Sequence, residues 1–279
     1  MLKRKLHKAG FIIASFIFVA ITSGSKPVSK TPVINQPAYK AGHEFDSSGL
    51  CTCIPFTIGT HLANAPRIQI NKNVASFVKK YNKENGFFLS KAKTKVDNWF
   101  NVIDSMLVEY EIPAELKYLA FIESGLKNIT VSRSGAKGPW ALMPVAAKEY
   151  GLKVSKNNDE RLDYYKSTQA AAALLNDLYK KYDDWLLVIA AYNSGPAWIQ
   201  RAIKLSGSRN YWVLQNYLPK ETRSHIRRFI AVHYYFEGHG SLATMTKTET
   251  EAHIKEVEAF KIKQQELEKT DSVAVVIAQ

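Results

Sequence analysis

The segment from Pro113 to Pro144 constrains the fold of this chain more than any other, because an apolar helix runs there into a glycine-rich loop. Proline suits the first position of a helix, since its missing N–H would be unpaired there anyway. Leu116, Leu119 and Phe121 indicate a largely buried helix. Gly125 then supplies a helix stop. The segment therefore predicts a short buried helix that delivers its last residues to a loop.

Glu123 is expected in the last turn of this helix. Burial disfavours a charged carboxylate, and so does the negative end of the helix dipole. Both effects favour the protonated acid near neutral pH, which is the form that a general acid needs. The alternative is an ordinary carboxylate at a solvated helix end, and the spacing alone favours that alternative.

Further motifs follow in a fixed order. They are Glu123-Ser124, Gly135-Ala136-Lys137-Gly138, Pro139-Trp140, Met143-Pro144, Ala191-Tyr192-Asn193 and Pro219-Lys220-Glu221-Thr222-Arg223. Together this set, within residues 90–237, resembles the soluble lytic transglycosylase (SLT) family, and within it the membrane-bound murein transglycosylases. The resemblance implies an all-α, lysozyme-like domain that acts on peptidoglycan glycan strands. It also shifts the interpretation of Glu123 from a solvated carboxylate to a catalytic one.

The resemblance assigns roles to individual residues. Glu123 would protonate the glycosidic oxygen between N-acetylmuramic acid and N-acetylglucosamine, then take the proton of the muramic C6 hydroxyl to leave a 1,6-anhydro end. The substrate-binding residues carried over are Ser132, Met143, Tyr192, Asn193 and Glu221. The Tyr192 hydroxyl is expected to bond either Glu123 or the sugar. Alone, the Tyr192-Asn193 pair is also typical of a helix end before a Gly-Pro turn. No cofactor and no metal are implied.

Two departures from the family pattern favour a competing hypothesis. Ala141 stands where the family has a glutamine in the sugar cleft, and Ala146 where it has a threonine. A domain weakened at these positions would bind peptidoglycan without cleaving it. A third hypothesis is a hydrolase similar to goose-type lysozyme, which would leave reducing ends. Such an enzyme ordinarily needs a second carboxylate. Glu115 is a poor candidate, because it lies roughly 12 Å from Glu123 along a helix, and Glu221 approaches only through the fold.

The charge of the chain is concentrated near its start. The net charge is +13, and residues 1–100 contribute 15 Lys and Arg against 4 Asp and Glu, or +11. This basic excess suits association with an anionic cell-envelope or membrane surface. No zinc-finger spacing or RNP-type aromatic motif is present in the sequence, so nucleic acid is not an expected partner.

The chain divides into four predicted parts. Residues 1–24 read as a signal peptide, because a lysine-rich start precedes an apolar core, Phe11–Ile21, that is too short to span a bilayer comfortably. The alternative is an uncleaved anchor. Residues 25–70 form a proline-rich linker, 71–240 the catalytic domain with its preceding helices, and 241–279 a charged helical tail. The predicted location is outside the cytoplasm, in the periplasm or cell envelope.

Several local features are predicted in detail. Gly86 is expected to break the first helix, and Ser90 to cap a second one. Another helix is predicted from Trp140 to Tyr150, with Trp140 packed in the core, and the last residues, Val273 to Ala278, have a strand-like composition. Cys51 and Cys53 are too few for a disulfide scaffold and complete no metal-ligand set in the sequence. Few strand-like runs occur within residues 73–237, which favours the all-α class.

Overall fold

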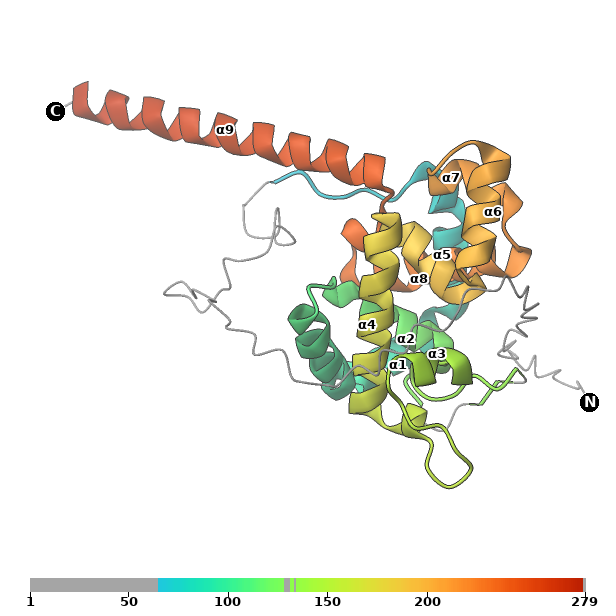
Figure 1. The fold of residues 1–279 in the computed structure, drawn as a ribbon. Coiled ribbons are helices and arrows are strands. Elements are labelled where there is room, and N and C mark those ends of the chain that lie inside the picture. Colours follow the sequence, from blue (N-terminus) through green and yellow to red (C-terminus); the bar gives the residue numbers. More distant parts are fainter. Residues whose placement is uncertain (1–64, 128–130, 133, 278–279) are drawn as a thin grey trace, which may run out of the picture.

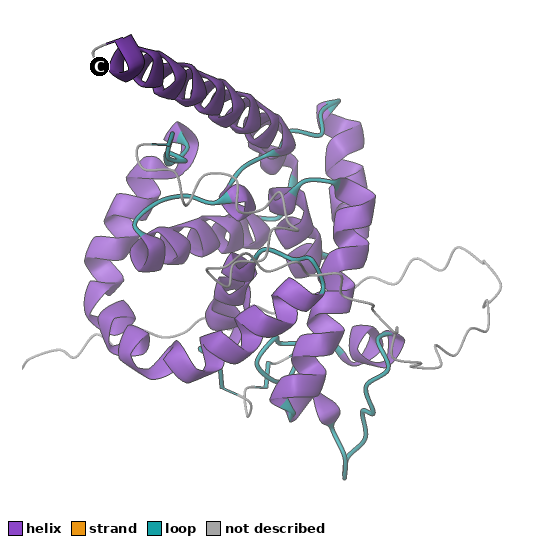
Figure 2. Ribbon diagram, turned by 90° about the vertical axis from the view of Figure 1, so that its left-hand side faces the viewer, coloured by secondary structure: helices purple, strands orange, loops and turns teal. Residues whose placement is uncertain are grey.

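A computed structural model describes residues 65–127, 131–132 and 134–277 of the chain (Figure 1). The α-helices are α1 (Lys72–Glu109), α2 (Lys117–Ser124), α3 (Pro144–Glu149), α4 (Tyr164–Tyr182), α5 (Trp185–Ser194), α6 (Pro196–Ser206), α7 (Tyr211–Leu214), α8 (Lys220–Glu237) and α9 (Lys247–Ile277). The remaining pairing within these residues consists of isolated β-bridges, and no strand is formed there (Figure 2). The all-α prediction is confirmed. The predicted signal peptide, most of the linker, Cys51 and Cys53 lie outside the described residues.

Helix α1 is continuous through Gly86, so the predicted break there and the cap at Ser90 are wrong. Val78 and Leu89 are both buried. Their spacing of three helical turns keeps the apolar stripe in phase across the glycine. Helix α8 packs along α1, and the Tyr235 hydroxyl donates to the Gly86 carbonyl at 3.0 Å. Tertiary packing therefore outweighs the roughly 0.5–1 kcal/mol that an interior glycine costs a helix.

Glu123 lies in the last turn of α2, as predicted. The segment begins with a 3₁₀ turn at Ala114–Leu116, and Pro113 stands just before it. Leu119 and Phe121 are buried on α2, and Gly125 ends the helix with a φ of 64°. The left-handed conformation of this glycine turns the chain away from the helix axis. As a result, Glu123 stands at the point where the helix meets the loop.

Helix α5 forms the centre of the core. Every residue from Trp185 to Ala191 is buried, which is the pattern of a helix covered on all sides. Helices α4, α6 and α8 pack against it. Asp184 caps the helix, because its carboxylate accepts the Leu187 N–H at 3.1 Å. The core thus fixes the end of α5, where Tyr192 and Asn193 lie.

Other boundaries differ from the predictions. Helix α3 begins at Pro144, because Ala141 adopts a φ of 48° that no α-helix accommodates and Leu142 pairs with Lys137 in a β-bridge. The predicted helix over Trp140–Tyr150 is therefore too long. Helix α9 continues through Val273 to Ile277, so the strand-like interpretation of the last residues is wrong. This helix extends away from the other helices in both ribbon views (Figures 1 and 2). None of the helices in the described part is long and apolar enough to cross a membrane.

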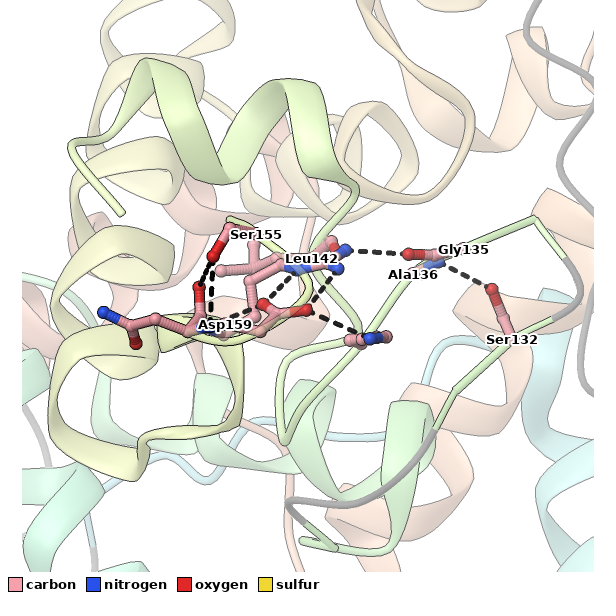
Figure 3. A network of polar contacts seen from close by, with 9 residues as sticks. Ser132, Gly135, Ala136, Leu142, Ser155 and Asp159 are labelled. Carbon is pink, nitrogen blue, oxygen red and sulfur yellow. Dashed lines mark hydrogen bonds and ion pairs between the residues drawn. The ribbon is translucent and has the colours of Figure 1, made fainter. Parts of the chain in front are cut away.

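The loop between α2 and α3 is held by a network of polar contacts that includes Gly135, Leu142 and Asp159 (Figure 3). The Arg161 side chain is 3% exposed and donates to both Asp159 carboxylate oxygens, at 2.8 and 2.7 Å. It also donates to the Gly135 carbonyl at 2.7 Å and the Leu142 carbonyl at 3.0 Å. The hydrogen bonds that Asp159 accepts from Arg161, and secondarily the one from Lys137, hold the pKa of its carboxyl low, at about 2. One guanidinium therefore ties two points of the loop, Gly135 and Leu142, to each other.

Two glycines of this loop provide a matched test of its packing. Gly138 has a φ of 82°, and a Cβ there would lie 1.8 Å from the Arg161 carbonyl oxygen. Gly135 has a φ of 87°, but a Cβ there would meet nothing within 4 Å. We expect Gly135→Ala to lower the free energy of unfolding by about 1–2 kcal/mol, the cost of a left-handed backbone. Gly138→Ala should cost more, on the order of 3–5 kcal/mol, because it also displaces a buried ion pair.

Urea denaturation followed by circular dichroism measures both losses. Equal losses in the two variants would show that the Arg161 contact does not constrain the loop.

Candidate active site

The Glu123 carboxylate lies against a buried histidine from α8. Its Oε1 atom is 2.8 Å from Nε2 of His225. The Glu123 side chain is 13% exposed and the His225 side chain 2%. A partly exposed carboxyl that is held from behind by a buried partner can still reach a ligand. This is the arrangement expected of a group that exchanges a proton with a bound substrate.

Glu221 approaches the same group from the first turn of α8. Burial raises the pKa of the Glu221 carboxyl, and the neighbouring Glu123 raises it further, whereas His225 and Arg228 lower it. Within the described part of the chain, the buried Oε1 of Glu221 has no hydrogen-bond partner. The fold thus brings a second carboxylate close to Glu123, although the two are far apart in sequence.

Tyr192 lies beside Glu123 but bonds elsewhere. Burial, and secondarily the charge of Glu123, raises the pKa of Tyr192 well above its usual range. Its hydroxyl donates to the Trp140 carbonyl, so the expected bond to Glu123 is not the one that forms. Trp140 is fully buried, as predicted, and its indole N–H donates to the Thr168 hydroxyl at 2.9 Å. Tyr192 therefore fixes the loop next to the carboxylate.

Ser124 strengthens the same junction. Its hydroxyl lies 3.2 Å from the Ala120 carbonyl, the local bond expected of it, and 2.7 Å from the Pro139 carbonyl across the loop. The residue after Glu123 is thereby bound to the residue before Trp140. The end of α2, the loop and α5 form one connected unit around the carboxylate.

The remaining predicted site residues lie in the surrounding elements. Asn193 is buried, with 2% of its surface exposed, near the end of α5. Ser132 is in the loop, where its hydroxyl accepts the Ala136 N–H at 2.9 Å and lies 2.9 Å from the Ser134 hydroxyl. Met143 is half-buried and directly precedes α3. These two contacts of Ser132 therefore shape the loop, and its role toward a ligand stays a prediction.

His225 is the residue that the sequence reasoning missed. A signal for it was present, because it follows Glu221 by four residues and therefore lies on the same face of α8. The Pro219–Arg223 motif contains Glu221 but ends before His225, so the resemblance assigned no role to the histidine. No group of three or more His, Cys, Asp or Glu residues suited to a metal ion occurs among the described residues.

The sequence was compared with protein families and with characterised relatives. The profile of the Transglycosylase SLT domain matches residues 101–215. The membrane-bound lytic murein transglycosylase D of Escherichia coli K12 is 33% identical over 153 residues, which are 53% of this chain and 33% of that protein. The chain thus spans about a third of the length of this curated relative. Glu123, Ser132, Met143, Tyr192 and Asn193 lie inside the matched profile, whereas Glu221 and His225 follow it.

Solved structures of lytic transglycosylases show weaker likeness. An inactive mutant of lytic transglycosylase Slt from Pseudomonas aeruginosa has a TM-score of 0.44 at 17% identity, covering 52% of this chain and 26% of that one. The 70 kDa soluble lytic transglycosylase of Escherichia coli has a TM-score of 0.46 at 20% identity, covering 62% and 32%. The profile match and the curated relative agree: residues 101–215 of this chain are similar to the Transglycosylase SLT domain.

Proposed function

We propose that this chain is a peptidoglycan lytic transglycosylase with Glu123 as its catalytic acid and base. It would cleave the β-1,4 bond between N-acetylmuramic acid and N-acetylglucosamine without water and leave 1,6-anhydro-N-acetylmuramic acid ends. The observation that carries the proposal is the partly exposed Glu123 carboxyl, held at a helix end inside the SLT domain by a buried partner.

The reaction needs one carboxyl that first gives and then takes a proton. Protonated Glu123 gives its proton to the glycosidic oxygen as the bond from C1 of muramic acid breaks. The N-acetyl group of the substrate stabilises the cationic carbon that results. Glu123, now a carboxylate, accepts the proton of the C6 hydroxyl while that oxygen bonds C1. Water is not consumed, and no metal or cofactor enters the scheme.

Ser132, Met143, Tyr192, Asn193 and Glu221 are proposed to surround the glycan in this scheme. We also propose that the chain works outside the cytoplasm, in the periplasm or cell envelope, after export through residues 1–24. Residues 71–240 would form the catalytic unit, preceded by the linker and followed by the tail at 241–279.

Glu221 supports hydrolysis as a second candidate function. Retaining and inverting glycosidases pair an acid with a second carboxylate that acts as nucleophile or activates water, and Glu221 is close enough to Glu123 for their charges to interact. Burial raises the pKa of Glu221, however, so its ionisation carries a cost that the scheme with one carboxyl does not incur. We therefore prefer the scheme with one carboxyl, and the products distinguish the two.

Digestion of purified peptidoglycan, with the products weighed by mass spectrometry, tests the proposal. Anhydromuropeptides are lighter by one water than the products of hydrolysis. We expect them from the wild type, whereas reducing ends would assign the second function. Glu123→Gln should lower turnover by roughly 10²- to 10⁴-fold, the usual contribution of a general acid, with unchanged far-UV circular dichroism. Full activity in that variant would contradict the mechanism.

Ala141 provides a gain-of-function test. If the family glutamine contacts the glycan, its loss costs about 1–3 kcal/mol. Ala141→Gln should then raise turnover by roughly 5- to 150-fold. Val145→Gln is the control, because Val145 is 77% exposed on the neighbouring α3. No gain at position 141 would show that the departure is neutral. Wild-type protein that co-sediments with peptidoglycan without cleaving it would identify a binding domain instead.

Glu221 should lower stability at neutral pH, because its folded-state pKa is raised. Above both the folded and unfolded pKa values, the buried charge disfavours the folded state; below both, the carboxyl is protonated in each state and the cost vanishes. We expect Glu221→Gln to raise the melting temperature at pH 7 and to leave it unchanged below about pH 4, near the ordinary glutamate pKa. Glu149→Gln, at an exposed carboxylate of α3, is the matched control. A gain that persists undiminished at low pH would point to packing rather than charge.

A further inference from the structure

His225 is the buried group in contact with Glu123, and the proposed chemistry does not yet use it. It lies on α8, one turn after Glu221, and its side chain is 2% exposed. Its Nε2 atom is 2.8 Å from Oε1 of Glu123. Helix α8 packs against α1, α2 and α5 at once, so the imidazole is presented by a rigid element.

The surroundings of the other ring nitrogen select the tautomer. Nδ1 of His225 is buried and has no hydrogen-bond partner within the described part of the chain. A proton on Nδ1 would therefore be a buried donor without an acceptor. Leaving Nδ1 unprotonated, as a buried acceptor without a donor, costs less free energy. The neutral tautomer with its proton on Nε2 is therefore favoured. His225 then donates to Glu123 Oε1.

The charged and titratable groups around the pair come from several helices. Glu221 of α8 interacts with His225 and Arg228 of the same helix and with Glu123 of α2. Tyr192 of α5 interacts with Glu123. Within the described residues, His225 is the group that these contacts place in direct hydrogen-bonding distance of the Glu123 carboxyl. It is therefore the group able to fix the orientation of that carboxyl.

We propose that His225 is a positioning residue that donates from Nε2 to Oε1 of Glu123 and leaves Oε2 as the oxygen that faces the glycan. This inference rests on the proposed function. In the first half of the reaction, Oε2–H gives its proton to the glycosidic oxygen; in the second half, Oε2 takes the proton of the C6 hydroxyl. The Nε2 proton of His225 stays in place throughout, so the imidazole undergoes no net change.

Positioning of this kind affects turnover more than binding. A reacting group displaced by about 1 Å loses on the order of 10²-fold in rate. Binding of the glycan depends on the rest of the cleft and should change little. A side chain that merely filled space would behave differently, since any substitution of similar volume would replace it.

Three substitutions at one position separate these roles. The amide nitrogen of glutamine can reach the position of the His225 Nε2 atom. Asparagine is shorter, and its amide nitrogen reaches only the position of Nδ1. Phenylalanine fills the same volume but has no hydrogen-bond donor. We expect His225→Phe and His225→Asn to lower kcat by roughly 10- to 100-fold, with peptidoglycan co-sedimentation within twofold of wild type. His225→Gln should recover most of the loss. In a Glu123→Gln background, His225→Phe should cause no further loss.

His233 provides the control on the same helix. It is fully buried, and its Nε2 atom is 2.8 Å from the Ser241 hydroxyl. It lies eight residues from His225, about 12 Å along α8. We expect His233→Gln to change the melting temperature but to leave kcat, relative to the folded fraction, unchanged.

The outcomes distinguish this inference from the function on which it rests. Wild-type protein that releases no anhydro products would overturn both. If the wild type is active and the kcat of His225→Phe lies within twofold of the wild-type value, the inference alone is overturned. Equal activity of His225→Gln and His225→Asn would overturn it too. Long-range ¹H–¹⁵N correlation spectra of the ¹⁵N-histidine-labelled full chain, with His225 assigned by its absence in His225→Gln, give a readout independent of turnover. A protonated Nε2 supports the inference and a protonated Nδ1 overturns it.

Discussion

The buried guanidinium of Arg161 is the contact on which the arrangement around Glu123 depends. It bonds Asp159 on one side and two carbonyls of the α2–α3 loop on the other. Because its charge is paired and its donors find acceptors, burial is tolerated; removing Asp159 would leave a buried cation without its partner. The loop then presents its Pro139 and Trp140 carbonyls to Ser124 and Tyr192. The carboxylate is thus placed by a chain of polar contacts that begins away from it.

Helix α8 supplies the other half of the site. It carries Glu221 and His225 in its N-terminal half, and near its C-terminal end Tyr235 bonds the carbonyl of Gly86. The contact that keeps α1 continuous and the contact that orients Glu123 therefore lie on the same helix. A change that shifts α8 along α1 would act on both. The stability of the helical body and the geometry of the site are coupled through this element.

The sequence was informative where one local rule dominates. The apolar spacing, Gly125 and the buried Trp140 placed Glu123 at a helix end beside a loop, and the structure agrees. Predictions from local sequence were wrong where tertiary contacts determine the conformation or the hydrogen-bond partner. Gly86 does not break α1 because α8 covers it, and the Tyr192 hydroxyl finds a carbonyl exposed by the left-handed turn at Ala141. No local motif marks His225, because its contact partner, Glu123 on α2, lies 102 residues away in sequence.

Two carboxyl groups, Glu123 and Glu221, lie near His225, and they differ in their exposure and in their hydrogen-bond partners. Glu123 keeps part of its surface exposed and receives a hydrogen-bond donor, so it can exchange a proton without leaving a buried charge unpaired. Within the described residues, Glu221 has a buried oxygen without a hydrogen-bond partner, and burial raises the pKa of its carboxyl. In the proposed scheme the acceptor is a hydroxyl of the substrate itself, so no second carboxylate is needed to activate water.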